Sequence, residues 1–265
     1  MSEWKGQTAL VTGASYGIGT AFAQTLAAAG AHLILTARSR DRLEMLANEL
    51  RRQYGVNVTL IEADLAQPDA PQFIFDEVQR QGLRVDLLVN NAGFGVAGDF
   101  AKLPLERQLE MIQVNVTALV ALAHLFVQPM LQRRAGAILN VSSTAAFQGV
   151  PYFAVYSGTK SFILIFSEAL WAECRDQGVR VSALCPGATE SNFGAVAGTT
   201  QRKLRGKVQT AEEVVDAALD ALAHGRSHVV TGVNNKLMVQ VERFVSRKTA
   251  VSAAERLFKQ FASKQ

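Results

Sequence analysis

A tyrosine and a lysine stand four residues apart in the segment Tyr156-Ser157-Gly158-Thr159-Lys160. If this segment is helical, the spacing puts both side chains on one face of the helix. A phenol alone titrates at about pH 10, but a neighbouring ammonium group favours the phenolate and lowers the phenol's pKa. The pair is therefore suited to donate a proton to an oxygen that gains negative charge. Chance produces this spacing often, so the prediction depends on the residues that accompany it.

Three glycines are closely spaced in Thr12-Gly13-Ala14-Ser15-Tyr16-Gly17-Ile18-Gly19, between a β-branched run and a helical pattern. Glycines allow a tight turn and a close approach of the backbone to a pyrophosphate, and the start of the next helix offers unpaired N–H groups. The order of strand, glycine turn and helix predicts a dinucleotide-binding site. A plain glycine-rich turn is the alternative.

The second predicted strand ends in Leu35-Thr36-Ala37-Arg38-Ser39-Arg40. An NAD-preferring site usually has an acidic residue here to hold the ribose 2′-OH, and this segment has none. Arg38, with Arg40 nearby, is suited to pair with a 2′-phosphate instead. We therefore predict NADP(H) in preference to NAD(H). A solvated arginine at the start of a helix is the alternative.

The chain alternates short apolar runs with longer helical patterns, without a Pro/Ser-rich linker. Uninterrupted apolar runs are typical of strands buried on both faces of a parallel sheet. The alternation predicts a Rossmann-like, doubly wound α/β fold with a seven-stranded parallel sheet, helices on both faces and a single domain. The expected strands are 8–12, 32–36, 58–62, 87–90, 137–142, 180–184 and 228–231, and the expected helices are 18–29, 40–53, 70–81, 105–133, 152–177 and 211–224.

Residues 1–232 form this predicted domain, and the aperiodic segment 187–208 is expected to be a substrate loop, with a disordered insertion as the alternative. Residues 233–265 are expected to form a helical extension that packs on the domain or extends it. In the extension, Ala254, Leu257, Phe258 and Phe261 follow helical spacing, and Met238, Val241, Phe244 and Val245 suggest a second amphipathic helix.

Further polar residues are expected at the carboxyl edge of the sheet, where doubly wound folds bind their ligands. Ser142 and Ser143 end the fifth strand, and the segment Asn90-Asn91-Ala92-Gly93 ends the fourth. Asn115 interrupts an apolar helical segment, so a buried amide there needs hydrogen-bond partners.

Together these residues resemble the short-chain dehydrogenase/reductase family in its classical form. The resemblance covers roughly residues 6–232, and its motifs occur in the family's order. They are the segment 12–19, Asp64-Leu65, the segment 90–93, Asn115, Ser143, Tyr156 with Lys160, and Pro186-Gly187.

The resemblance implies a role for each matching residue. Tyr156 would be the catalytic acid/base, Lys160 would hold the nicotinamide ribose and lower the tyrosine pKa, and Ser143 would orient the substrate carbonyl. Asn115 would support a water-linked proton relay to Lys160. The implied cofactor-binding residues are Gly13, Ser15, Tyr16, Gly17, Ile18 and Gly19 at the phosphates, Asp64 and Leu65 at the adenine, Asn91 with Ala92 and Gly93 at the ribose, and Pro186, Gly187, Thr189 and Ser191 near the carboxamide.

The function predicted from these features is NADPH-dependent hydride transfer between the nicotinamide and a carbonyl or secondary alcohol. Candidate substrates are a 3-oxoacyl thioester or another apolar ketone. Phe94, Phe147, Phe153 and Phe193 are candidates for the substrate cleft, with ordinary core packing as the alternative for each. A non-catalytic dinucleotide-binding sensor or interaction protein on the same fold is the competing function, which the complete set Asn115, Ser143, Tyr156 and Lys160 disfavours.

The formal net charge of +4 is concentrated near the end of the chain, because residues 202–265 hold 12 Lys and Arg against 6 Asp and Glu. Arg202, Lys203, Arg205 and Lys207 are consistent with an anionic or carrier-linked substrate, and a solvated basic surface explains them equally well. The basic amphipathic tail raises peripheral membrane contact as a hypothesis. We find no nucleic-acid recognition motif and no metal-ligand spacing among the histidines and cysteines.

The sequence also gives expectations about assembly and location. A homodimer through the helices 105–133 and 152–177 is expected, with a tetramer as the alternative. The N-terminal residues lack the basic-then-apolar order of a signal peptide, and no uninterrupted apolar run reaches about 18 residues. Two cysteines fit a reducing compartment, so cytoplasm is the expected location.

Overall fold

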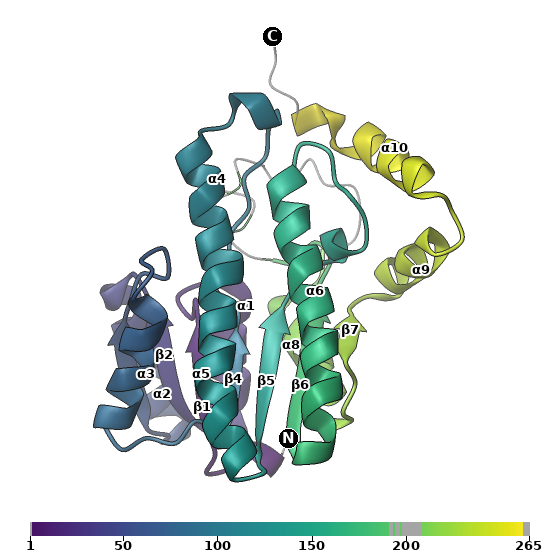
Figure 1. Cartoon of the computed structure of the whole chain (residues 1–265). Coiled ribbons are helices and arrows are strands. Elements are labelled where there is room, and N and C mark those ends of the chain that lie inside the picture. Colours follow the sequence, from purple (N-terminus) through teal and green to yellow (C-terminus); the bar gives the residue numbers. More distant parts are fainter. Residues whose placement is uncertain (1, 191–192, 194–196, 198–207, 262–265) are drawn as a thin grey trace.

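A seven-stranded parallel sheet with the order β3-β2-β1-β4-β5-β6-β7 forms the centre of the molecule in the computed structural model (Figure 1). The structure describes residues 2–190, 193, 197 and 208–261. The strands are β1 (Thr8–Thr12), β2 (His32–Ala37), β3 (Val58–Glu62), β4 (Leu87–Asn90), β5 (Gly136–Val141), β6 (Val179–Cys185) and β7 (His228–Val230). The predicted doubly wound fold is confirmed.

Helices cover both faces of this sheet, because neighbouring residues of each strand point to opposite sides. In β1, Val11 packs with residues of α1, α2 and α8, whereas Leu10 packs with residues of α3, α5 and α6. The longer helices are α1 (Gly17–Ala28), α2 (Arg40–Tyr54), α3 (Ala70–Arg80), α4 (Leu105–Ile112), α5 (Ala118–Gln132), α6 (Ala154–Cys174), α8 (Ala211–Ala223), α9 (Val233–Glu242) and α10 (Arg247–Phe258).

The predicted helix 105–133 is interrupted rather than uniform. A π-helical turn, Gln113–Thr117, separates α4 from α5, and the buried Asn115 lies within it. Such turns insert one extra residue into a helix and often occur at functional sites. The apolar pattern on either side gave no signal of the interruption, apart from the asparagine itself.

The same helical stretch, Leu105–Gln132, is long and apolar enough to cross a membrane by length and composition. In the structure it packs against the sheet, and Phe126 and Met130 of α5 are buried in the core. Helices that cover a parallel sheet have this composition because one face is buried against apolar strands.

The direction in which successive strands are added to the sheet reverses between β1 and β4. β1 lies here between β2 and β4 and is parallel to both. The connections from these strands leave in opposite directions at this point, so the carboxyl edge of the sheet is open there. The glycine turn follows β1 and the segment Asn90-Asn91 follows β4. The fold thereby brings together two motifs that are about eighty residues apart in the sequence.

The C-terminal extension contains two helices, as expected, but their apolar residues face different surroundings. Ala254 of α10 is buried, and Phe258 and Phe261 pack against Phe153. Leu257 departs from the expected inward face, because its side chain is 62% exposed. In α9 the buried residue is Val239. The expected stripe of Met238, Val241, Phe244 and Val245 is exposed and runs past the end of the helix at Glu242, with Phe244 88% exposed.

Candidate active site

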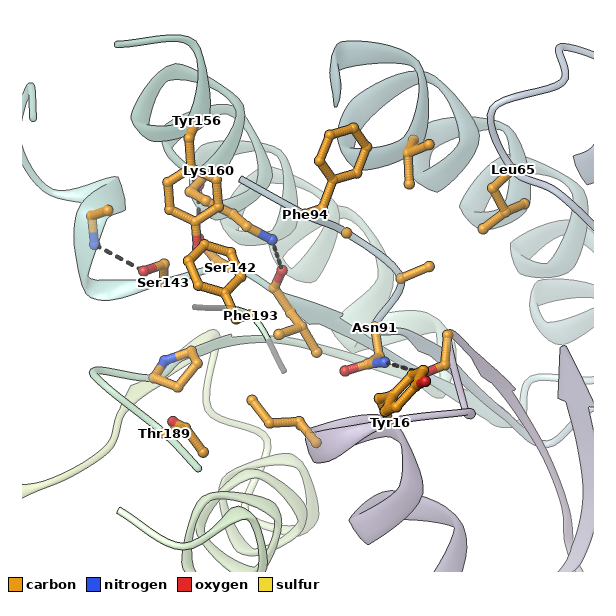
Figure 2. A pocket seen from close by; sticks show the side chains of 18 of the residues that line it. Tyr16, Leu65, Asn91, Phe94, Ser142, Ser143, Tyr156, Lys160, Thr189 and Phe193 are labelled. Atoms are coloured by element: carbon orange, nitrogen blue, oxygen red, sulfur yellow. Dashed lines mark hydrogen bonds between the residues drawn. The ribbon is translucent and has the colours of Figure 1, made fainter. Parts of the chain in front are cut away.

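A cavity of about 490 Å³ lies over the carboxyl edge of the sheet and contains most of the residues predicted to bind a cofactor (Figure 2). The predicted residues that line it are Gly13, Ser15, Tyr16, Ile18, Arg38, Asp64, Leu65, Asn91, Ala92, Gly93, Ser143, Tyr156, Lys160, Pro186, Gly187 and Thr189. Gly17, Gly19 and Asn115 lie outside the lining. Ser191 and the basic residues Arg202, Lys203, Arg205 and Lys207 fall outside the described residues.

Two glycines of the glycine turn, Gly13 and Gly19, have no room for a side chain. Gly13 has a φ of +64°, and a Cβ atom there would lie 2.9 Å from the Cα of Ala92. A Cβ atom on Gly19 would lie 2.3 Å from the carbonyl oxygen of Gly13. Gly19 therefore serves the packing of α1 against the turn, whereas Gly13 lines the cavity itself.

The start of α1 is suited to receive a phosphate. The residue before the helix, Tyr16, makes no side-chain capping hydrogen bond, so the first N–H groups of α1 are available to an anion. The Tyr16 ring lines the cavity, and the guanidinium of Arg42 lies 3.8 Å from the ring centroid. Arg42, which the sequence reasoning missed, thus holds the edge of the turn through a cation–π contact.

Asn91 joins the end of β4 to the glycine turn. Its side-chain amide donates to the carbonyl oxygens of Thr12, at 2.8 Å, and of Gly13, at 3.2 Å. The Thr12 hydroxyl in turn accepts hydrogen bonds from the backbone N–H groups of Asn91 and Ala92, both at 3.0 Å. These bonds hold the two walls of the cavity at a fixed separation.

Two arginines follow β2, and their surroundings differ. Arg40 pairs with Glu44 at 2.8 Å and with Glu62 at 3.9 Å, so its charge is already balanced. Arg38 lines the cavity and has no ion-pair partner among the described residues. Of the two, Arg38 is therefore the cation that remains available to an anionic ligand.

The neighbouring wall holds Asp64 and Leu65, which follow β3. The Asp64 carboxylate accepts a hydrogen bond from the backbone N–H of Ala66, which fixes its orientation. Val114 also lines the cavity here, although the sequence reasoning did not select it. The two walls, the glycine turn and the uncapped start of α1 together fit a dinucleotide.

Lys160 is buried, and its ammonium group donates to the carbonyl oxygen of Val141 at 2.9 Å. Ser142 fixes the same turn of α6 from the other side, because its hydroxyl donates to the Lys160 carbonyl oxygen at 2.7 Å. Burial lowers the pKa of Lys160 to about 8, because a charged ammonium loses solvation there. The lysine is positioned by β5 on one side and by α6 on the other.

The predicted effect of Lys160 on Tyr156 is not seen in the structure. Burial raises the pKa of Tyr156 to about 12, and a hydrogen bond with Ser143 opposes this rise. The Lys160 nitrogen lies 5.7 Å from the centroid of the Tyr156 ring and is directed to a carbonyl oxygen. In the protein alone, desolvation of the phenol therefore determines the direction of the Tyr156 pKa.

Ser143, rather than Ser142, is the serine that faces Tyr156. The hydroxyl of Ser143 accepts from the backbone N–H of Ala145 at 3.1 Å and caps a short 3₁₀ turn, Thr144–Ala146. Figure 2 shows the side chains of Ser143, Tyr156 and Lys160 gathered on one side of the cavity. Two hydroxyl groups and one ammonium group therefore meet where a polar atom of a ligand can approach.

Asn115 lies behind this group and does not line the cavity. Its amide donates to the Phe94 carbonyl oxygen at 2.9 Å and to the Thr159 hydroxyl at 3.1 Å, and its oxygen accepts from the Phe94 N–H at 3.0 Å. A Cβ atom on Gly93 would lie 3.0 Å from the Asn115 oxygen and 3.4 Å from the Lys160 nitrogen. Asn115 therefore ties the segment after β4 to the helix that holds Lys160.

The Pro186-Gly187 turn forms another wall and is held by α9. A Cβ atom on Gly187 would lie 2.2 Å from the side-chain nitrogen of Asn235, which donates to the Thr231 carbonyl oxygen at 2.8 Å. Thr189 lines the cavity, and its hydroxyl donates back to the Gly187 carbonyl oxygen at 3.1 Å. The C-terminal extension thus shapes the cavity at this turn.

The far end of the cavity is aromatic. Phe153 meets Phe258 and Phe261 edge-on, with ring centroids 5.7 and 5.6 Å away, and the Tyr156 ring lies 5.2 Å from that of Phe193. Phe94 lines the cavity as well, whereas Phe147 packs beside His228 in a separate cluster. Of the four predicted phenylalanines, Phe147 is therefore the exception.

Phe258 and Phe261 were missed as cavity residues. Their helical spacing with Ala254 did signal an apolar face, but nothing in the sequence says what that face covers. The connection through α9 brings α10 over the cavity, so the face becomes part of its wall.

Comparison with known proteins identifies the class to which this chain belongs. The family model for short chain dehydrogenases matches residues 7–202. The chain therefore belongs to the short-chain dehydrogenase family, and it is an oxidoreductase that acts on CH–OH groups.

Individual relatives agree with this assignment. A 7beta-hydroxysteroid dehydrogenase of Collinsella aerofaciens is 32% identical over 239 residues, which are 89% of this chain and 90% of that enzyme. A very-long-chain 3-oxoacyl-CoA reductase of Anas platyrhynchos is 35% identical over 68% of this chain and 59% of that protein. A short-chain dehydrogenase from Sphingobium yanoikuyae, solved in complex with NADPH, superimposes with a TM-score of 0.82 at 32% identity and covers 94% of this chain and 93% of its own.

Proposed function

We propose that the protein uses NADPH to reduce the carbonyl group of a large apolar substrate, with Tyr156 as the acid/base. The observation that carries this proposal is the position of the Ser143 and Tyr156 hydroxyls, with Lys160 beside them, under an aromatic wall. Groups that can stabilise and protonate an alkoxide thus adjoin a surface that binds apolar carbon skeletons.

In the proposed reaction the chain's residues act on the substrate oxygen. The bound nicotinamide supplies the hydride. The hydroxyls of Ser143 and Tyr156 donate hydrogen bonds to the oxygen as negative charge develops on it. Tyr156 gives up its proton to form the alcohol, and the Lys160 ammonium stabilises the phenolate that remains. Asn115 holds the segment after β4 in a fixed position relative to the helix turn that carries Lys160.

The preference for NADP(H) is supported by Arg38. This arginine lines the cavity without a carboxylate partner among the described residues, whereas the charge of Arg40 is balanced by Glu44 and Glu62. An unbalanced cation favours a ligand with an additional phosphate.

The substrate class is supported by the aromatic end of the cavity. Four aromatic rings, those of Phe153, Phe193, Phe258 and Phe261, surround the space beside Tyr156. Such a wall favours ring systems or long acyl chains over small polar ketones. Relatives named for hydroxysteroids and for very-long-chain 3-oxoacyl-CoA are consistent with either form.

A panel of carbonyl compounds tests this proposal. NADPH absorbance is followed with ring-bearing ketones, 3-oxoacyl thioesters, small ketones and sugars, and NADH is run in parallel. We expect turnover with at least one bulky apolar ketone and a higher kcat/KM with NADPH. Turnover confined to small polar substrates would overturn the substrate class, and NADPH binding without turnover on any carbonyl would favour the non-catalytic alternative.

The proposed assembly is a homodimer through α4 and α6. Leu105, Leu109 and Ile112 of α4 and Phe162 and Ile165 of α6 are large apolar side chains on the surface, and Ile165 is 67% exposed. The two helices contact each other and form one face of the molecule (Figure 1). A cytoplasmic location remains our proposal, for which subcellular fractionation is the test.

A further inference from the structure

The outward face of α9 carries a row of large apolar side chains. Val233, Leu237 and Val241 recur every four residues and are 81%, 64% and 51% exposed, and Phe244 just beyond the helix is 88% exposed. Residues at this spacing share one face of a helix, whereas the buried Val239 lies on the opposite face and anchors α9 to the protein. The apolar row therefore points directly away from the core.

Basic side chains accompany this row. Lys236 and Arg243 are exposed beside it, and the following segment adds the exposed cations Arg247, Lys248, Arg256 and Lys259. In the part of the chain that the structure describes, none of these six forms an ion pair. The acidic residues of the two helices are Glu255 and Glu242, and one Glu242 carboxylate oxygen is buried.

We propose that α9 binds the surface of an anionic membrane, with its apolar row in the headgroup region and its basic residues against lipid phosphates and carboxylates. A helix with an exposed apolar face and adjoining Lys and Arg has the composition of an interfacial helix. Lys236 and Arg243, which have no carboxylate partner among the described residues, supply the charge complementarity to an anionic surface, and four further unpaired cations follow in the next segment. The protein contacts the membrane from one side and does not cross it through α9.

A second copy of the chain fits this face poorly. In a two-fold dimer the same patch meets itself, so Lys236 and Arg243 would approach the same basic patch of the partner subunit. The one carboxylate of α9 is the half-buried Glu242, one oxygen of which is buried, so it can balance only part of this positive charge. The apolar residues of α4 and α6 form a separate face, which is the better candidate for self-association.

The arm formed by α9 and α10 also connects this face to the cavity. Figure 1 shows the two helices at the edge of the molecule, joined by a short connection. Phe258 at the end of α10 and Phe261 just beyond it line the cavity, whereas Leu237 and Phe244 belong to the outward row. The arm therefore carries the outward apolar row on α9 and contributes part of the cavity wall at the end of α10. The membrane proposal itself stands independently of the reaction proposed above.

Vesicle flotation with the full chain tests the proposal. One set of vesicles contains phosphatidylcholine alone, and the other adds phosphatidylserine. The variant Leu237→Gln/Phe244→Ser removes two apolar side chains from the row, and Met45→Gln/Phe73→Ser is its control on exposed residues of α2 and α3. Arg243→Glu reverses one charge of the arm, with Arg52→Glu of α2 as the matched control.

We expect the wild-type chain and both controls to float with the anionic vesicles only. The apolar double variant should lose at least about tenfold in vesicle affinity, and Arg243→Glu about tenfold. Unchanged Tm values and unchanged NADPH affinity would show that the variants are folded.

Three results would overturn the proposal. The first is a lack of flotation with anionic vesicles, and the second is flotation that the α9 variants leave unchanged or that neutral vesicles support equally. The third is a loss of native mass on Leu237→Gln/Phe244→Ser without lipid, measured by sedimentation equilibrium, which would assign this face to contact between copies of the chain.

Discussion

In the proposed reaction, Lys160 sets the pH range in which Tyr156 acts beside a positive charge. Its folded-state pKa of about 8 lies below its ordinary value of 10.5, because the ammonium is buried, while burial raises the pKa of Tyr156 to about 12. Below pH 8 the lysine is charged and the tyrosine still carries its proton. Between about pH 8 and about pH 12 the tyrosine keeps its proton, but Lys160 is neutral and no longer provides a positive charge beside it.

The first prediction follows from this order of titration. In the direction of carbonyl reduction, kcat/KM should be constant below about pH 8 and fall above it, since this parameter reports groups of the free enzyme. Steady-state rates across this pH range provide the measurement. Lys160→Arg, whose guanidinium stays charged, should show no fall near pH 8 in whatever activity it keeps. A wild-type profile that stays flat through pH 10 would contradict the role given to Lys160.

Arg38 and Arg40 give a matched pair of variants for cofactor preference. Arg38→Ala should raise the Kd for NADPH by roughly tenfold or more and leave that for NADH nearly unchanged, because a charge-assisted bond to the 2′-phosphate is lost. Arg40→Ala should change neither by much, since Arg40 is paired with Glu44 and Glu62. Calorimetric titrations with NADPH and with NADH measure the Kd values of both variants. Equal effects of the two variants would refute the assignment of the phosphate to Arg38.

Individual residues differ in how far the sequence could predict them. Gly13, Ser143, Tyr156 and Lys160 belong to motifs with fixed spacing, and the structure brings them to one cavity. The direction of the Tyr156 pKa could not be predicted, because it depends on how deeply the phenol is buried and on where the Lys160 ammonium points. Arg42 was missed because its contact with Tyr16 spans two elements and leaves no local pattern.

At the scale of elements, the π-helical turn Gln113–Thr117 and the helix α10 each bring a residue to the site from a part of the chain outside the sequence motifs. The turn directs Asn115 at the segment after β4, while α10 brings Phe258 to the aromatic end of the cavity. Hydrophobic periodicity predicted a helix over 105–133 and another near the C-terminus, but it did not predict what these helices contact. The turn was invisible because one extra residue hardly alters an apolar pattern.

The aromatic wall yields a prediction about substrate size. Phe258→Ala/Phe261→Ala should raise the KM for bulky apolar ketones about tenfold and leave the NADPH Kd unchanged, because both rings lie at the substrate end. Phe244→Ala, in the same C-terminal arm but 88% exposed, is the control in a lipid-free assay. If the double variant kept its KM, or lost NADPH affinity instead, these rings would not belong to the substrate wall.

At the scale of the whole molecule, the apolar faces of α4/α6 and of α9, both formed by described residues, should respond to different variants. Leu109→Glu/Ile165→Glu should convert a dimer into a monomer, since charges would be buried between copies of α4 and α6. Val241→Glu on α9 should leave the native mass unchanged. Sedimentation equilibrium without lipid measures both. A dimer that survives the first variant and dissociates with the second would reverse the assignment of the two faces.

The overall topology was the most predictable property of this chain. Short apolar runs such as residues 87–89, together with the glycine turn after the first strand, are sufficient to predict a doubly wound parallel sheet. The direction in which α9 presents its apolar residues was not predictable, because periodicity shows that a helix has an apolar face but not whether that face is covered.

In the proposed reaction, Tyr156 protonates the substrate oxygen while the rest of the site binds the cofactor. The most direct measurement is single-turnover transfer of deuterium from labelled NADPH to a bulky ketone, in the wild-type chain and in Tyr156→Phe, with the NADPH Kd determined on the same samples. We predict a loss of transfer of about 10²- to 10⁴-fold in the variant with a nearly unchanged Kd. Transfer at the wild-type rate in Tyr156→Phe would contradict the account.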